Sequence, residues 1–205
     1  MTETARRTPA DVWREMVRGN ERFVAGQPAH PRQDVERREE LAAAQAPHAA
    51  LFGCSDSRLA AEIIFDKGLG DLFVVRNAGQ VISDSAIASL EYAVAVLDVP
   101  LIVVLAHDAC GAVQAAIDLD KPDARPLPPH IAGHIAAIRP SVRAAASRDP
   151  EAVGLTHLER TVSELVARSE LIADGVAAGT LAVVGANYKL LEGTAVPAVI
   201  VGDAA

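Results

Sequence analysis

The chain contains two cysteines, and both have neighbours suited to binding a metal ion. Cys54 lies in the run Gly53-Cys54-Ser55-Asp56-Ser57-Arg58, and Cys110 is the third residue after His107. Thiolate sulfur and imidazole nitrogen are ligands that zinc prefers, and a catalytic zinc keeps a fourth position open for water. We therefore predict that Cys54, His107 and Cys110 hold one Zn²⁺ per chain. The alternative is a pair of buried, inert thiols.

Both cysteines follow apolar runs, 49–52 and 101–106, which are typical of buried strands in a parallel sheet. The carboxyl ends of such strands are where open α/β sheets place their ligands. Hydrophobic periodicity and turn residues predict the remaining elements. Further strands are expected at 71–75 and 180–186, with an antiparallel edge strand at 196–201, and helices at 8–25, 33–45, 60–65, 85–97, 110–119 and 130–178, the last interrupted near 149–150.

This alternation predicts an α/β fold with a mostly parallel central sheet of about four parallel strands plus an antiparallel edge strand. Helices are expected on both faces, and an N-terminal helical arm precedes the sheet. With 205 residues, half of them hydrophobic, the chain is long enough for one core. We expect a single domain over 1–205, made of a helical arm (1–46) and an α/β core (47–205).

The composition excludes several functions. A formal net charge of −8 and scattered basic residues argue against a nucleic-acid partner, because phosphate binding needs clustered Lys and Arg. No run approaches the roughly 20 apolar residues of a membrane span, and the polar start, Met1–Arg7, lacks the apolar core of a signal peptide. We expect a cytoplasmic protein with no membrane partner, where reducing conditions favour thiolate ligands over a disulfide.

Asp56 and Arg58, two residues apart beside Cys54, are oppositely charged. They could form an ordinary loop ion pair, but next to a ligating cysteine we interpret them as a catalytic dyad. Four blocks of the sequence then resemble a β-class carbonic anhydrase, in order and over roughly 13–193. The blocks are Cys54-Ser55-Asp56-Ser57-Arg58, Arg76-Asn77-Ala78-Gly79, Glu91-Tyr92-Ala93-Val94 and His107-x-x-Cys110-Gly111.

The resemblance implies a lyase, carbonate dehydratase, in which zinc-bound hydroxide reversibly hydrates carbon dioxide to bicarbonate and a proton. Cys54, His107 and Cys110 match the family's zinc ligands, and Asp56 and Arg58 match its dyad. The resemblance also implies substrate-binding residues. These are Gln45, which reaches the site of a partner chain, and Phe73, Ala78 and Tyr92, which line a narrow apolar pocket.

Gly111 is grouped with the substrate-binding residues, because backbone amides at a helix N-terminus favour anionic ligands. We also expect the turn into this helix to require glycine. Since Gln45 and Tyr92 would act across a subunit boundary, the predicted minimal active unit is a homodimer. Whether dimers pair into tetramers stays open.

Family resemblance also implies an open and a closed form. If the Asp56–Arg58 pair breaks, Asp56 can become the fourth zinc ligand, and lower pH should favour this closed form. Some closed-type relatives bind bicarbonate at a regulatory site made of a Trp, an Arg and a Tyr. Arg76 and Tyr188 align with two of these residues, but Leu51 stands in place of the Trp, so we do not expect this regulatory site.

Other functions compete with this one. Hydrolases of carbon disulfide or carbonyl sulfide share the zinc ligands and the dyad. A non-catalytic zinc site or thiol switch would need a fourth protein ligand to close the site, for which Asp56 is the candidate. A nucleotide-binding domain is disfavoured because no G-x-G-x-x-G turn follows the first strand. His130 and His134, spaced i and i+4, are interpreted as surface residues. His30, His48 and His157 have no motif around them, and one of the three could relay protons to buffer.

Overall fold

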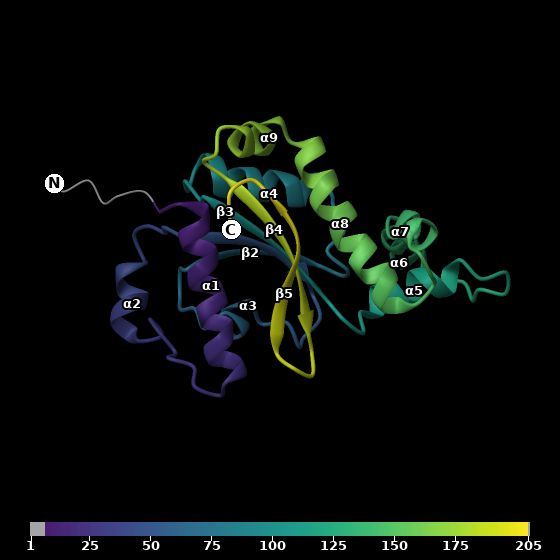
Figure 1. Ribbon diagram of the computed structural model, residues 1–205, viewed down its shortest axis with the longest axis horizontal. Coiled ribbons are helices and arrows are strands. Elements are labelled where there is room, and N and C mark those ends of the chain that lie inside the picture. The colour runs from purple at the N-terminus through teal and green to yellow at the C-terminus, as the bar shows by residue number, and fades with distance from the viewer. Residues whose placement is uncertain (1–6, 205) are drawn as a thin grey trace.

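The computed structural model describes residues 7–204, so the polar start at 1–6 lies outside the described part. Its centre is a five-stranded sheet with the strand order β2-β1-β3-β4-β5 (Figure 1). The first four strands in this order run parallel and β5 pairs antiparallel with β4, which confirms the predicted α/β fold. The strands are β1 (Ala49–Cys54), β2 (Leu72–Asn77), β3 (Leu101–His107), β4 (Ala182–Lys189) and β5 (Thr194–Val201).

The two strands that carry the cysteine motifs are neighbours in the sheet. β1 lies between β2 and β3, and every residue of β1 and β3 is buried. Continuous burial explains why both strands are uninterrupted apolar runs, since side chains on both faces pack against helices. The parallel register pairs Gly53 with Leu105, so both strands end at the same edge of the sheet.

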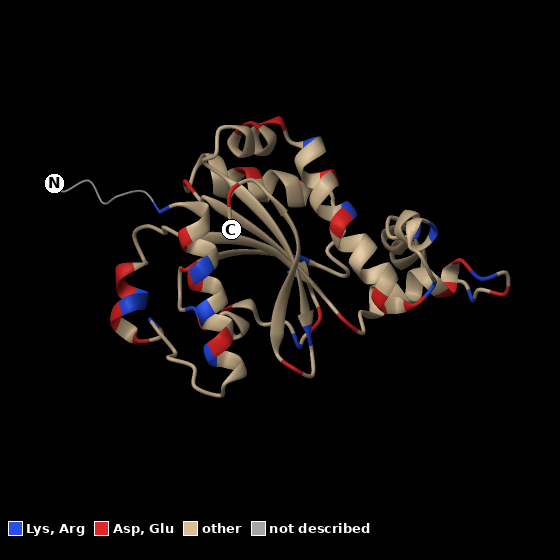
Figure 2. Cartoon of the chain, in the orientation of Figure 1, with Lys and Arg blue, Asp and Glu red and all other residues tan. Residues whose placement is uncertain are grey.

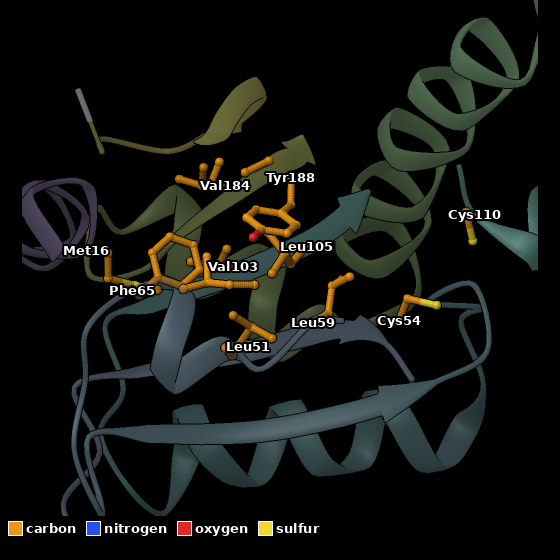
Figure 3. Close-up of a cluster of buried hydrophobic side chains, with 14 of the residues drawn as sticks. Met16, Leu51, Cys54, Leu59, Phe65, Val103, Leu105, Cys110, Val184 and Tyr188 are labelled. Carbon is orange, nitrogen blue, oxygen red and sulfur yellow. The ribbon is translucent and has the colours of Figure 1, made fainter. Parts of the chain in front are cut away.

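Helices cover both faces of the sheet. One face packs against α1 (Pro9–Val24), α3 (Ala61–Ile64) and α5 (Gly111–Leu119), and the other against α4 (Asp84–Ala95), α8 (Pro150–Arg168) and α9 (Glu170–Ala177). Successive strand residues alternate between the two resulting cores, as in Leu51 on the first and Phe52 on the second. Figure 3 shows the first core, with Met16 and Phe65 at one end and Cys54 and Cys110 at the other.

The N-terminal helices precede the sheet as expected, but they differ from each other. α1 begins with a capping box between Thr8 and Asp11 and buries three apolar side chains against the sheet, those of Val12, Trp13 and Met16. α2 is shorter than the predicted 33–45: it spans Val35–Glu40, is capped by Asp34 and buries no residue. A helix without a buried face has little packing energy to extend it.

α6 (Pro129–Ala136) and α7 (Arg139–Ala144) lie beyond the carboxyl ends of the strands, next to α5 (Figure 1). Within residues 7–204, no helix combines the length and apolarity needed to cross a bilayer. Acidic and basic residues are interspersed on α1 and α2, while the sheet is nearly free of charge (Figure 2). The edge of the sheet at which β1 ends in Cys54 is therefore surrounded by α5, α6 and the loops that follow β1 and β2.

Candidate active site and metal centre

Three potential metal ligands converge at the carboxyl edge of the sheet. Cys54 ends β1, His107 ends β3, and Cys110 caps the start of α5. Their ligand atoms all lie within 4.8 Å of one another, and all three residues are buried. Because β1 and β3 are hydrogen-bonded neighbours, the sheet itself brings together ligands that are far apart in the sequence.

The hydrogen bonding of His107 leaves one ring nitrogen free for a metal ion. Nδ1 lies 2.8 Å from the Asp108 carbonyl oxygen, and since a carbonyl only accepts, Nδ1 must carry the proton. Nε2 therefore has an available lone pair. It is buried, and no group in the described part of the chain hydrogen-bonds it. A buried acceptor without a partner is costly, and a metal ion beside the two thiols would satisfy it.

The two thiols perturb each other. The neighbouring Cys110 thiol, with contributions from His107 and the Gly79 amide, lowers the pKa of Cys54, whereas the Cys54 sulfur and burial raise the pKa of Cys110. Ionising both sulfurs is therefore unfavourable unless a positive charge lies beside them. A divalent cation would supply that charge, since thiolate is the form that ligates metals. Two sulfurs and one imidazole form a donor set that fits zinc.

Asp56 forms a bidentate ion pair with Arg58 at the rim of this cluster. Arg58 Nε donates to Asp56 Oδ1 at 2.9 Å and Nη2 donates to Oδ2 at 2.7 Å, while the Arg58 amide also donates to Oδ1. These bonds from Arg58 hold the pKa of Asp56 well below its ordinary range. Asp56 Oδ2 lies 4.0 Å from His107 Nε2, so an ionised carboxylate faces the cluster in the open arrangement.

Arg76, at the end of β2, fixes the loop that carries this ion pair. Its Nε donates to the Cys54 carbonyl at 2.9 Å and its Nη2 donates to the Asp56 carbonyl at 2.7 Å. Both side-chain contacts are to backbone, so Arg76 sets the path of the chain from Cys54 to Asp56. Arg76 entered the sequence analysis as part of a family block and as an aligned position in a regulatory site, and this positioning role was missed.

Gly79 lies against Cys54 and donates its amide hydrogen to Cys54 Sγ at 3.2 Å. Its φ of +78° is in the left-handed region, and an added Cβ would come within 2.8 Å of Ala112 Cβ and 2.9 Å of Ile138 Cδ1. Only glycine fits this position without displacing a neighbour. Gly111 differs: an added Cβ would meet nothing within 4 Å, so the expectation that its turn requires glycine is wrong.

The structure places the predicted pocket residues around β2 and α4. Phe73 and Tyr92 form a tilted aromatic pair with ring centroids 6.1 Å apart. Tyr92 is 47 % exposed, and Ala78 is exposed beside Gly79. Gln45 is exposed in the loop between α2 and β1, and no contact within the described chain links it to the cluster. The large exposed area of Tyr92 is unusual for an aromatic residue that a sequence pattern assigns to a core.

Two histidines outside the predicted set of site residues hold the loop beside Cys54. His134 Nε2 lies 2.7 Å from the Ala78 carbonyl oxygen, and His157 Nε2 lies 2.7 Å from the Gly79 carbonyl oxygen. His134 is partly buried rather than a free surface residue. His157 is buried, which lowers its pKa, and this burial makes it unsuited to passing protons to buffer. Neither contact has a sequence signature, because each partner is a backbone carbonyl.

Comparison with known proteins gives a consistent result. The family profile described as carbonic anhydrase matches residues 49–195. Carbonic anhydrase 2 of Mycobacterium tuberculosis H37Rv is 50 % identical over 192 residues, covering 92 % of each chain. A carbonic anhydrase of Mycolicibacterium smegmatis is 50 % identical over 191 residues, covering 90 % of this chain and 91 % of the relative.

Solved structures agree with the sequence relatives. A tetrameric β-carbonic anhydrase of Sordaria macrospora superposes with a TM-score of 0.69 at 26 % identity, covering 84 % of this chain and 90 % of the other. A β-carbonic anhydrase of Aspergillus fumigatus superposes with a TM-score of 0.69 at 27 % identity, covering 91 % and 88 %. Sequence family, near full-length relatives and fold coincide, and the chain therefore belongs to the β-class carbonic anhydrases, as a carbonate dehydratase.

Proposed function

We propose that this protein hydrates carbon dioxide reversibly to bicarbonate and a proton with one Zn²⁺ held by Cys54, His107 and Cys110. The observation that carries the proposal is the buried His107 Nε2, which has no hydrogen-bond partner in the described chain and faces two thiols within 4.8 Å. When bound there, zinc supplies a Lewis acid that brings the pKa of water close to neutrality and makes it a nucleophile.

In this proposal Asp56 accepts a hydrogen bond from the attacking water and orients the lone pair of that water. The bidentate bond from Arg58 keeps the Asp56 carboxylate ionised and fixes its direction. Arg76 holds the backbone on both sides of Ser55, which limits movement of Asp56. Closure by Asp56 as a fourth ligand would require these Arg58 bonds to break.

We further propose that the substrate enters along the apolar surface of Phe73, Ala78 and Tyr92, with Gly111 at the anionic product. The minimal active unit in this proposal is a homodimer, in which Gln45 reaches the partner's site. Supporting it are the exposure of Gln45 and of apolar side chains near β2, α3 and α4, namely Ile63, Leu69, Tyr92 and Val96. Pairing of dimers into a tetramer, the state named for the Sordaria enzymes, is a matter for hydrodynamic measurement.

The chain is proposed to act as one domain and to work in the cytoplasm. Supporting this compartment are two free thiols, which as metal ligands must stay reduced. Lys and Arg residues alternate with Asp and Glu along the helices in Figure 2, and we propose no nucleic-acid or membrane partner.

Metal analysis together with stopped-flow carbon dioxide hydration tests the proposal. Wild type should contain about one zinc per chain, and a chelator should abolish turnover until zinc is restored. Cys54→Ser should lose both zinc and turnover, while Ser57→Ala, at an exposed position in the same loop, should keep both. Zinc without turnover in wild type would favour a structural metal. Faster turnover of carbonyl sulfide or carbon disulfide would assign a different substrate.

A further inference from the structure

The peptide group between Ala78 and Gly79 connects a histidine on α6 to a proposed zinc ligand. Its carbonyl oxygen accepts a hydrogen bond from His134 at 2.7 Å, and its amide hydrogen is donated to Cys54 Sγ at 3.2 Å. Both ends of one conjugated amide are therefore engaged. Because a carbonyl only accepts, His134 Nε2 must carry a proton and act as the donor.

The loop that contains this peptide is held rigidly. The next carbonyl, that of Gly79, accepts from His157 Nε2 at 2.7 Å, and the other ring nitrogen of His157 lies 3.3 Å from Ser141 Oγ. His157 lies on α8 and His134 on α6, so two helices fix two consecutive carbonyls. With Gly79 also packed against Ala112 and Ile138, the amide cannot turn away from Cys54 without breaking several contacts.

Hydrogen bonds in a chain polarise one another, by about 10–30 % per bond. Donation from His134 to the Ala78 carbonyl makes the Gly79 N–H a stronger donor. A stronger donor withdraws more electron density from the Cys54 sulfur. That matters at a site with two thiolates, because each thiolate reduces the positive charge that a metal ion presents to water, and hydrogen bonds to the ligand sulfur counteract this reduction.

We infer that His134 is a positioning residue for the hydration reaction, which acts on Cys54 Sγ through the Ala78–Gly79 peptide and keeps the metal ion strongly Lewis acidic. This inference rests on the proposed zinc function. It assigns His134 no contact with substrate. It predicts that the hydrogen-bond donor at position 134, rather than the volume of the ring, is what the site requires.

The test compares His134→Ala with His134→Gln, whose side-chain amide keeps a donor, and with His130→Ala as a matched control. His130 lies one turn earlier on α6 and is exposed. Two readouts are measured on each variant. The first is the sulfur-to-metal charge-transfer band of the Co²⁺-substituted protein, which reports electron density on sulfur independently of turnover. The second is the pH profile of carbon dioxide hydration.

His134→Ala should move the charge-transfer band to longer wavelength and the pH midpoint of hydration upward by about 0.2–0.5 units, the size expected from a 10–30 % change in one charge-assisted hydrogen bond. His134→Gln should recover most of both shifts, and His130→Ala should show neither. The inference is overturned if His134→Ala matches wild type in both readouts, or if Ala and Gln at position 134 shift them equally. Failure of wild type itself to bind zinc would instead overturn the proposed function.

Discussion

Replacing Gly79 with alanine should damage the protein in a way that its own structure allows to be estimated. The new Cβ would lie 2.8 Å from Ala112 Cβ and 2.9 Å from Ile138 Cδ1. The Ile138 terminus can rotate away, but Ala112 Cβ is fixed to the backbone of α5, so α5 or the Gly79 loop must move. Such overpacking typically costs about 1–3 kcal/mol. The left-handed φ of +78° adds about 1–2 kcal/mol for a residue with a side chain.

The expected loss for Gly79→Ala is therefore about 2–5 kcal/mol, equivalent to roughly 5–20 °C in melting temperature for a domain of this size. Displacement of the Gly79 amide should also weaken zinc binding about tenfold, the lower end of the effect of losing a partner of a metal ligand. Differential scanning calorimetry and competition with a chelator measure the two quantities. Gly111→Ala is the matched control, because its Cβ enters open space. Equal melting temperatures for the two variants would refute the reasoning.

Three other perturbations have defined outcomes. Arg58→Ala should release Asp56, raise the pKa of Asp56 and lower the rate of carbon dioxide hydration about 100-fold, with zinc retained. Arg58→Lys should recover only part of the lost rate. Unchanged turnover in Arg58→Ala would remove Asp56 from the reaction. Asp71 is fully buried, and although burial opposes it, hydrogen bonds from Arg32 and the Gly68 amide lower its pKa. A folded-state pKa below the unfolded value of 3.8 contributes stability at higher pH. That stability is lost as pH falls through 3.8 toward the lowered folded-state pKa, so urea midpoints should drop below about pH 4, and less steeply in Asp71→Asn. Gln45→Ala chains mixed with inactive Cys54→Ser chains should regain about a quarter of wild-type activity. About half of randomly paired dimers are mixed, and each mixed dimer has one intact site, with Cys54 from one chain and Gln45 from the other. No recovery would place Gln45 in its own chain's site.

Apolar patterning predicted the strands and their ends well for a physical reason. β1 and β3 are buried at every position, and burial on both faces leaves a run of apolar residues that no loop resembles. The positions of Cys54 and His107 at strand ends followed from those runs alone. α2 was predicted too long, because alternating charges over 33–45 indicate a helix but do not show whether a buried face exists to stabilise it.

The surroundings of the ligands were harder to predict than the ligands. Side-chain types indicate a metal site, but the contacts by which Arg76, His134 and His157 hold the loops around it are to backbone carbonyls. A carbonyl is present at every residue, so no spacing distinguishes the one that is used. The same limit explains Gly79 and Gly111, since only packing around each position tells a required glycine from a replaceable one.

Two of the proposed zinc ligands, Cys54 and His107, end adjacent parallel strands, which bears on when a metal ion could be bound. Parallel pairing of β1 with β3 requires the intervening chain through α3, β2 and α4 to have crossed over first. Under the proposed zinc function, His107 and Cys110 would offer only two of the three ligands before that step. Tight binding of the ion would then wait until β1 has joined β3, so metal loading would follow correct folding rather than start it.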